Sequence, residues 1–219
     1  MPWRLRAVTF AGVNDAHHQG AANDKRSLRR TLRARRRALD GRAQRQAALG
    51  AAERLTRLPA WRRARRVALY LPADGELDPS VILRRAWHEG RRICLPVLRP
   101  DGALAFRRLT ADTPLRANRL GLLEPAGPRA VAVPLAHLDL VLMPLVGFDA
   151  AGRRLGMGGG FYDRTLAGRG RFRRPALVGL AHECQRVGEL PSESWDVPLD
   201  AVITGQRLYR FPRGGAGTR

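Results

Sequence analysis

The sequence contains almost no lysine, little cysteine and no long apolar run. Lys25 is the single lysine among 40 basic residues, so arginine supplies nearly all of the positive charge. Two cysteines, Cys94 and Cys184, are too few for a disulfide framework, and neither lies in a Cys-x-x-Cys pair. We therefore expect free thiols in a reducing compartment and no structural zinc site. No apolar segment approaches the length of about 18 residues that indicates a transmembrane helix.

Acidic and aromatic residues are also scarce. The 19 acidic residues leave a formal net charge of +21, which predicts attraction to polyanions such as RNA. However, the arginines are spread along the whole chain, and no aromatic residues are interleaved with them as in a stacking platform for single strands. We therefore predict no specific nucleic-acid partner, and an RNA-binding protein is kept as the alternative.

The length of 219 residues suits one sizeable core. The first 23 residues lack the apolar stretch of a secretory signal, so we predict a cytoplasmic protein without a membrane anchor. Residues 1–23 are predicted to be a disordered extension, residues 24–211 a single α/β domain, and residues 212–219 a disordered tail.

Helical and strand patterns alternate along the chain. Asn23 or Asp24 can cap the first helix, Asp40 the second, and Pro59 is expected to end the second. The region 110–138 is rich in proline and is predicted to be mainly loop. The alternation predicts an α/β fold with a doubly wound, mainly parallel sheet and flanking helices, Rossmann-like and preceded by N-terminal helices. The expected helices are 24–39, 42–58 and 78–88, and the expected strands are 67–71, 93–98, 103–109, 140–146, 177–181 and 201–203.

A glycine-rich stretch follows the strand 140–146. After a turn at Asp149–Gly152 come two arginines, then Gly156 and three consecutive glycines, 158–160, before a helix start at Phe161. Glycines let backbone N–H groups approach a ligand closely, and arginines donate to phosphate oxygens. The order predicts a phosphate-binding loop. No Gly-Lys-Ser/Thr follows, so it is not a P-loop, and a flexible surface turn is the alternative.

The segment from Arg154 to Asp163, Arg-Leu-Gly-Met-Gly-Gly-Gly-Phe-Tyr-Asp, resembles the signature of the 5-formyltetrahydrofolate cyclo-ligase family, also called methenyltetrahydrofolate synthetases. Three further segments resemble family motifs in the same order: Lys25–Arg29, Leu71–Asp78 and Trp195–Asp200. The resemblance covers about 25–204. It departs from the family pattern at Met157 between two loop glycines and at Phe161, where many relatives carry tyrosine.

The resemblance implies ATP as co-substrate and 5-formyltetrahydrofolate as substrate. It implies catalytic roles for Lys25, Arg154 and Tyr162. Substrate-binding residues would be Leu71, Glu76, Met157, Gly158, Gly159, Gly160 and Phe161. ATP-binding residues would be Lys25, Arg26, Ser27, Leu28, Arg29, Arg154, Leu155, Gly156, Met157, Gly158, Gly159, Gly160, Phe161 and Tyr162.

The resemblance also implies a metal site at Asp163 and Asp196. Carboxylate oxygens suit Mg²⁺ when the ion also binds phosphates and retains water. Asp200 is a nearby alternative that spacing does not distinguish from Asp196.

The expected reaction is ATP- and Mg²⁺-dependent conversion of 5-formyltetrahydrofolate to 5,10-methenyltetrahydrofolate by a monomer, through a phosphorylated formyl (iminophosphate) intermediate. A second alternative is another ATP-binding α/β enzyme that ignores folate.

Overall fold

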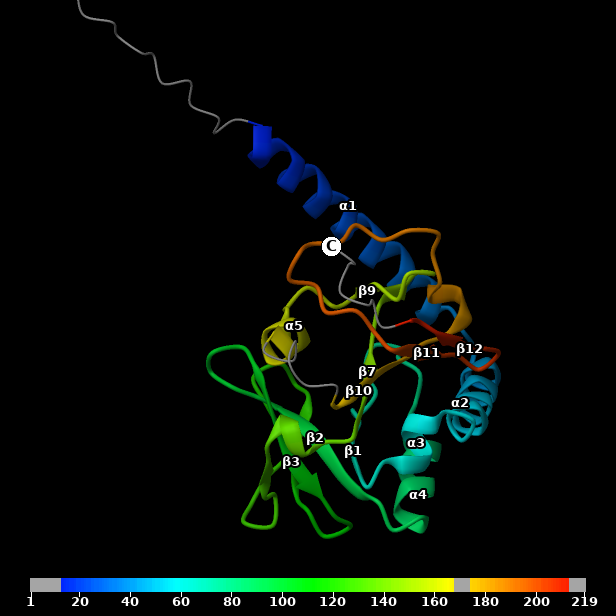
Figure 1. Ribbon diagram of the computed structural model, residues 1–219, viewed down its shortest axis with the longest axis vertical. Helices are drawn as coiled ribbons and strands as arrows, with labels where there is room; N and C mark the ends of the chain where they lie inside the picture. Colours follow the sequence, from blue (N-terminus) through cyan, green and yellow to red (C-terminus); the bar gives the residue numbers. More distant parts are fainter. Residues whose placement is uncertain (1–12, 168–173, 213–219) are drawn as a thin grey trace, which may run out of the picture.

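The computed structural model describes residues 13–167 and 174–212, with side chains from residue 24 onward (Figure 1). A central sheet and two small two-stranded sheets make up its β-structure. The central strands are β1 Arg66–Ala68, β2 Arg92–Leu98, β3 Leu104–Leu109, β6 Ala132–Val133, β7 Leu140–Pro144, β10 Ala176–Leu180, β11 Ala201–Ile203 and β12 Leu208–Arg210. The small sheets pair β4 Leu115–Ala117 with β5 Leu123–Pro125, and β8 Gly147–Phe148 with β9 Arg154–Leu155.

The eight central strands lie in the order β12-β11-β10-β7-β1-β2-β3-β6. The five in the middle, β11, β10, β7, β1 and β2, are mutually parallel, whereas β12, β3 and β6 are antiparallel additions at the two edges. The predicted α/β fold with a mainly parallel sheet is therefore confirmed. The chain order of the parallel strands reverses between β1 and β7, which is the topological switch point of a doubly wound sheet.

Five α-helices and two short 3₁₀ helices belong to the described residues. The first helix begins at Val13 rather than at residue 24, because no proline interrupts the segment before Asp24. Asp40 caps the second helix as predicted, its carboxylate accepting the N–H of Ala43 at 2.7 Å. The helices are α1 Val13–Arg37, α2 Gly41–Leu55, α3 Pro59–Arg63, α4 Ser80–His88, α5 Phe161–Leu166, η1 Leu135–His137 and η3 Glu183–Gln185.

Pro59 does not simply end the second helix. The helix α2 stops at Leu55, and Pro59 occupies the first position of the separate helix α3. Proline suits that position because its missing N–H would have no intrahelical partner there. The prediction of one helix through residue 58 was wrong for this reason.

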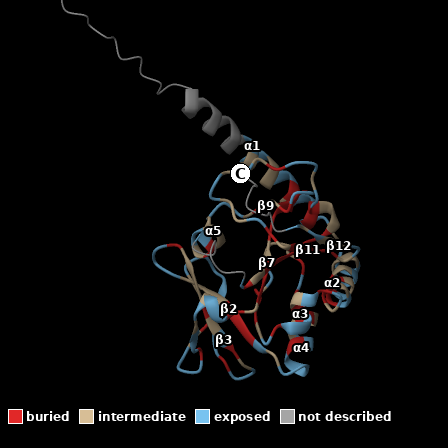
Figure 2. Cartoon of the chain, viewed as in Figure 1, coloured by how far each residue is buried: buried red, intermediate tan, exposed pale blue. Residues whose placement is uncertain are grey.

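The two faces of the sheet bury different clusters. Helices α2, α3 and α4 cover one face, where Leu55, Trp61 and Ile82 pack against the strands (Figures 1 and 2). On the other face α5 and the segments before β7 and after β11 cover Val141 and Met143. The four residues Leu140, Val141, Leu142 and Met143 of β7 are at most 1% exposed, as expected of a strand covered on both sides.

Three short strands lie in the region predicted to be mainly loop. The hairpin of β4 and β5 turns at Gly121, and β6 pairs with the edge of β3. Strands of two or three largely exposed residues leave no periodic pattern in the sequence. Among the described residues, no helix is long and apolar enough to span a bilayer. Of the predicted disordered ends, 1–23 and 212–219, residues 1–12 and 213–219 lie outside the described residues, and residues 13–23 belong to α1 instead.

Candidate functional site

A cavity of about 660 Å³ opens at the carboxyl ends of the strands on either side of the switch point. Tyr70 and Leu71 follow β1 on one side, and Pro144 and Leu145 come from the end of β7 on the other. The glycine loop and the β4–β5 hairpin form the remaining walls. Most of the lining is apolar, which suits a ligand with a flat hydrophobic body.

The sequence predicted a strand, a turn and then the glycine loop, but the structure has an additional hairpin between β7 and the loop. The chain first forms the β8–β9 hairpin around the predicted turn at Asp149, and the loop begins after β9. Gly158 has φ +103° and Gly160 has φ +61°, a region that favours glycine. A Cβ atom on Gly158 would lie 3.6 Å from the Arg29 guanidinium. The loop therefore packs closely against α1.

Helix α1 brings Arg29 to this loop and Lys25 to the C-terminal segment beside it. The Arg29 Nε donates to the carbonyl of Gly156 at 2.9 Å. The Lys25 Nζ lies 3.4 Å from an Asp196 oxygen and 3.5 Å from a Glu193 oxygen. Burial lowers the pKa of Arg29, while the charge of Asp196 acts in the opposite direction. Lys25 and Arg29 are thus one helical turn apart, and both lie near Asp196.

The intervening residues of α1 are placed differently. Arg26 and Ser27 are exposed, and Leu28 packs against a small apolar cluster that includes Leu32 and Leu155. Leu28 and Leu155, both expected to contact ATP, therefore direct their side chains into the core.

Arg154 joins the glycine-loop region to the C-terminal segment. Its Nη2 lies 2.6 Å from Asp163 Oδ1, and its Nη1 donates to the carbonyl of Val197. The N–H of Val197 lies 3.4 Å from the same Asp163 oxygen. Arg154 and Asp163 line the cavity together with Tyr162. Burial raises the pKa of the Tyr162 hydroxyl well above its usual value, so this group stays protonated at neutral pH.

The three candidate metal ligands occupy two different ends of the sheet. Asp163 and Asp196 lie near the carboxyl edge, where the Asp196 carboxylate accepts the N–H of Glu193 at 2.9 Å. Asp200 precedes β11 at the amino edge, and its carboxylate accepts the N–H of Leu177 at 2.8 Å. Within the described ranges no group of three or more His, Cys, Asp or Glu side chains forms a metal cage. Asp163 and Asp196 nevertheless offer carboxylate oxygens, the ligand type that Mg²⁺ takes when it completes its shell with phosphate oxygens and water.

Leu71 and Glu76, the predicted substrate-binding residues of the segment after β1, line another part of the cavity wall. A Glu76 oxygen accepts the N–H of Ala73 at 3.1 Å, and another lies 3.9 Å from Arg36 Nη2. Burial raises the pKa of Glu76, although the Ala73 N–H and the Arg36 charge act against it.

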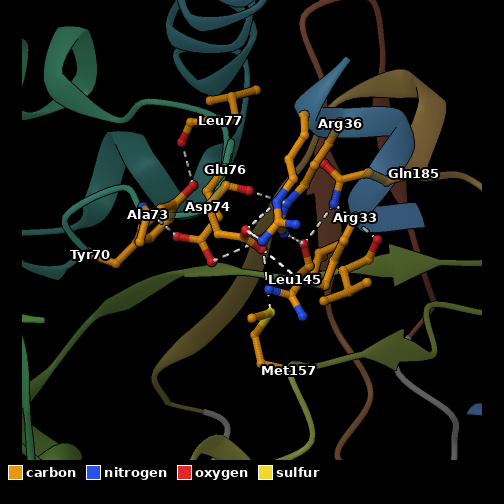
Figure 3. Close-up of polar contacts among 12 residues, drawn as sticks. Arg33, Arg36, Tyr70, Ala73, Asp74, Glu76, Leu77, Leu145, Met157 and Gln185 are labelled. Atoms are coloured by element: carbon orange, nitrogen blue, oxygen red, sulfur yellow. Dashed lines mark hydrogen bonds and ion pairs between the residues drawn. The ribbon is translucent and has the colours of Figure 1, made fainter. Parts of the chain in front are cut away.

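Sequence reasoning missed the arginines that hold this wall in place (Figure 3). Arg36 is fully buried and donates to the carboxylate of Asp74 at 2.7 Å, to its carbonyl at 2.9 Å and to the Leu145 carbonyl at 3.1 Å. Arg33 and Arg37 bind the same carboxylate. Burial alone would raise the pKa of Asp74, but these hydrogen bonds outweigh it and hold the pKa far below its usual range. The spacing of 33, 36 and 37 on one helix face was the available signal.

Met157 and Gln185 complete the surroundings of Arg36. The Met157 sulfur lies 3.8 Å from Arg36 Nη2, and the Gln185 amide donates to the carbonyls of Leu145 and Val146 at 2.6 and 3.0 Å. His182 is buried, and its Nε2 has no hydrogen-bond partner among the described residues. One network thus joins α1, the segment after β1, the end of β7 and the glycine loop.

The fold and the site define the class of protein: a doubly wound α/β protein with a ligand cavity at its topological switch point and a basic glycine loop at the cavity wall. The model of the 5-formyltetrahydrofolate cyclo-ligase family matches residues 21–205. The chain therefore belongs to this family of ligases.

Relatives and solved structures agree with this assignment. The 5-formyltetrahydrofolate cyclo-ligase of Escherichia coli K12 is 42% identical over 182 residues, which cover 82% of this chain and 100% of the relative. The Haemophilus influenzae protein of the same name is 43% identical over 148 residues, 66% of this chain and 78% of the relative. The NMR structure of Aquifex aeolicus 5,10-methenyltetrahydrofolate synthetase is similar with a TM-score of 0.74 at 28% identity, covering 89% of this chain and 96% of that one.

Proposed function

We propose that this chain converts 5-formyltetrahydrofolate to 5,10-methenyltetrahydrofolate, consuming ATP with Mg²⁺ and releasing ADP and phosphate. The observation that carries the proposal is the position of the glycine loop between α1 and the cavity. The glycine loop lies between Arg29 of α1 on one side and a largely apolar cavity of about 660 Å³ on the other. Lys25 lies one turn before Arg29 on the same helix, beside Asp196. A folate and the phosphates of ATP can therefore meet at this loop.

The reaction makes a poor leaving group into a good one. The formyl oxygen of the substrate attacks the γ-phosphorus of ATP and displaces ADP, which leaves an iminophosphate. The N10 nitrogen of the same folate then attacks the former formyl carbon, and phosphate departs with its oxygen. No protein nucleophile is needed, so the side chains mainly position the substrates and neutralise phosphate charge.

The basic side chains are assigned to the phosphates. Lys25 carries a compact ammonium on α1, and Arg154 offers a planar guanidinium from β9. Backbone N–H groups of the glycines from Gly156 to Gly160 add donors without side-chain bulk. Tyr162 is protonated at neutral pH like any tyrosine, and burial raises its pKa further, so it donates a hydrogen bond to a reacting oxygen and does not act as a base. Arg29 positions the loop through the Gly156 carbonyl.

The part of the cavity wall that carries Leu71 and Glu76 is assigned to the folate. Glu76 accepts N–H groups of the pterin, and Leu71, Met157 and Phe161 pack against its flat rings. Arg36 positions Glu76, because its guanidinium donates to the Asp74 carboxylate and lies 3.9 Å from the Glu76 carboxylate.

Asp163 and Asp196 would hold Mg²⁺. When bound, the ion offsets the negative charge of the transferring phosphoryl group. Their present partners, Arg154 and Lys25, are the cations assigned to the phosphates. These ion pairs keep the carboxylates and the basic groups close together. Monomeric state and cytoplasmic location remain predictions from the sequence.

A direct assay tests the proposal. Purified protein is mixed with Mg-ATP and 5-formyltetrahydrofolate, and methenyltetrahydrofolate is followed by its absorbance. We expect product that depends on both ATP and folate. If ATP turns over equally without folate, the chain is another nucleotide-binding α/β enzyme. If no product forms at high enzyme concentration, the proposed reaction is wrong.

A further inference from the structure

A second, smaller cavity lies on the same molecule, and three arginines line it. It has a volume of about 240 Å³ and is bordered by Arg66, Arg92 and Arg108, with Val131, Pro134 and His137 on the covering segment. We propose that this cavity binds a small anion of the phosphate class carrying two or more negative charges, such as pyrophosphate or a phosphate monoester.

The register of the sheet brings the three arginines to one face. Arg66 of β1 is the direct partner of Arg92 of β2. Arg108 of β3 is the partner of Cys94, two residues beyond Arg92 and therefore on the same side. Neighbouring strands lie about 4.8 Å apart, so the three side chains start close together. The guanidinium groups of Arg108 and Arg66 are near enough to the buried Cys94 to oppose the rise of its pKa, which burial nevertheless raises to about 11.

No acid neutralises these three groups within the described residues. No salt bridge involves Arg66, Arg92 or Arg108 in that part of the chain, and Arg66 Nη1 makes only a 3.4 Å hydrogen bond to the carbonyl of His137. The neighbouring Asp139 is already engaged: one oxygen accepts the N–H of Arg66 at 2.9 Å, and the other pairs with Arg174 at 3.2 Å. Like charges on adjacent strands repel, and a bound anion removes this repulsion. Guanidinium groups match phosphate oxygens in bidentate geometry.

The concave shape favours a small anion over a polymer. The floor is the buried thiol of Cys94, and the edge strand β6 with the residues after it forms one wall. A nucleic-acid backbone would need an open groove that tracks along the surface. Arg63 and Arg84 are exposed, as Arg92 and Arg108 are, but they lie on helices and line neither cavity.

This cavity is separate from the folate cavity. Arg92 is the first residue of β2, whereas the residues of this strand that line the folate cavity begin at Leu95, three residues and roughly 10 Å further along. The Arg92→Gln/Arg108→Gln double variant should therefore keep full turnover of 5-formyltetrahydrofolate.

Binding is measured by calorimetry with inorganic pyrophosphate at constant ionic strength, with saturating ATP analogue and Mg²⁺ present to occupy the catalytic phosphate site. We expect one binding event in the wild type and an affinity at least tenfold weaker in Arg92→Gln/Arg108→Gln. The matched control is Arg63→Gln/Arg84→Gln, which removes the same charge from exposed helix positions and should bind like the wild type. Equal weakening in both double variants would mean that net charge alone attracts the anion, and the proposal would be wrong.

A second measurement needs no variant. The wild-type protein is treated with phenylglyoxal, and modified arginines are located by mass spectrometry with and without pyrophosphate. We expect slower modification of Arg92 and Arg108 in its presence and unchanged modification of Arg63 and Arg84. Absence of protection at the two cavity arginines overturns the proposal. Protection by a short RNA but not by pyrophosphate overturns it too, since the ligand would then be a polymer.

Discussion

At the scale of single residues, Lys25 has the most specific expected effect. It is the single lysine of the chain, and its ammonium lies 3.4 Å from the candidate metal ligand Asp196. A compact ammonium fits between phosphate oxygens, whereas a guanidinium is wider and planar. We expect Lys25→Ala to lose about 1.5–3 kcal/mol in kcat/KM for ATP, the value of a hydrogen bond to a charged group.

Lys25→Arg should restore the charge but only part of the activity. The control is Arg30→Ala on the exposed part of the same helix, which should leave the kinetics unchanged. ATP KM and kcat are measured for all three variants. An arginine variant equal to the wild type would show that charge alone suffices, and an active alanine variant would remove Lys25 from the site.

The metal assignment is tested at three aspartates. Asp163→Asn and Asp196→Asn each remove one charged oxygen at the carboxyl edge, so each should raise the Mg²⁺ concentration required for half-maximal turnover. Asp200→Asn should matter less, because its side chain accepts a backbone N–H from Leu177 at the other edge and an amide oxygen can do the same. A magnesium titration of turnover decides between them. A large shift for Asp200→Asn with none for Asp196→Asn would reverse the assignment.

The buried carboxylate of Glu76 is expected to lower the stability of the protein at neutral pH and to contribute to the binding of 5-formyltetrahydrofolate. Burial raises its pKa, so the folded protein favours the protonated form; its contribution to stability is present below the usual pKa and is lost as pH rises through the folded pKa. At neutral pH the neutral isostere Glu76→Gln should therefore unfold at the same or a higher temperature than the wild type. It should raise KM for 5-formyltetrahydrofolate more than KM for ATP. A lower Tm with equal loss for both substrates would mean that Glu76 mainly supports the fold.

At the scale of elements, α1 is the part that fastens both walls of the cavity. Arg36 is fully buried, and its loss would leave the Asp74 carboxylate and the Leu145 carbonyl without a donor they now have. We expect Arg36→Met to lower the free energy of unfolding by about 1.5–3 kcal/mol, the value of a hydrogen bond to a charged group, because Arg33, Arg37 and Gln185 still donate to the same acceptors. The Arg37 side chain is 55% exposed, so Arg37→Met should lower the free energy of unfolding by about 1 kcal/mol or less. Urea denaturation compares the two, and equal losses would contradict a special role for Arg36.

The elements that could be predicted from the sequence are those with long periodic patterns. Helix α4 and strands β2, β3, β7, β10 and β11 fall within two residues of the expected boundaries or inside them, because their apolar residues face a core. The hairpin of β8 and β9 was missed, since Gly147 and Phe148 look like the end of the strand before them. Strand β12 was missed as well, because three residues at a sheet edge bury little.

The candidate site was predictable where a local motif carries it. The glycine loop and Glu76, both singled out from short stretches of sequence, line the cavity, whereas Lys25 lies beside Asp196 and its role in ATP binding stays a prediction. The buried pairing of Arg36 with Asp74 was not predicted, because arginine is so frequent in this chain that the sequence does not distinguish a buried arginine from an exposed one. A motif names positions only, and it is the packing of α1 that places the Leu28 side chain in the apolar cluster with Leu32 and Leu155.

At the scale of the whole molecule, the net charge of +21 has a consequence of its own. We expect RNA to bind without sequence preference, with an affinity that falls by at least about tenfold between roughly 50 and 200 mM salt. Fluorescence anisotropy with two labelled RNAs of unrelated sequence measures this. A preference for one RNA that persists at the higher salt would favour a dedicated nucleic-acid function.

The contact between Lys25 and the pair Glu193 and Asp196 joins the beginning of the domain to its end. During synthesis α1 leaves the ribosome well before the acidic partners of Lys25, which lie more than a hundred residues further along the chain. Until then Lys25 lacks these counterions, and Arg154 lacks its acceptor at Val197. The proposed phosphate-binding residues can therefore reach this arrangement only after the segment from Glu193 to Val197 has been made, and activity should not appear before that segment joins α1 and β9.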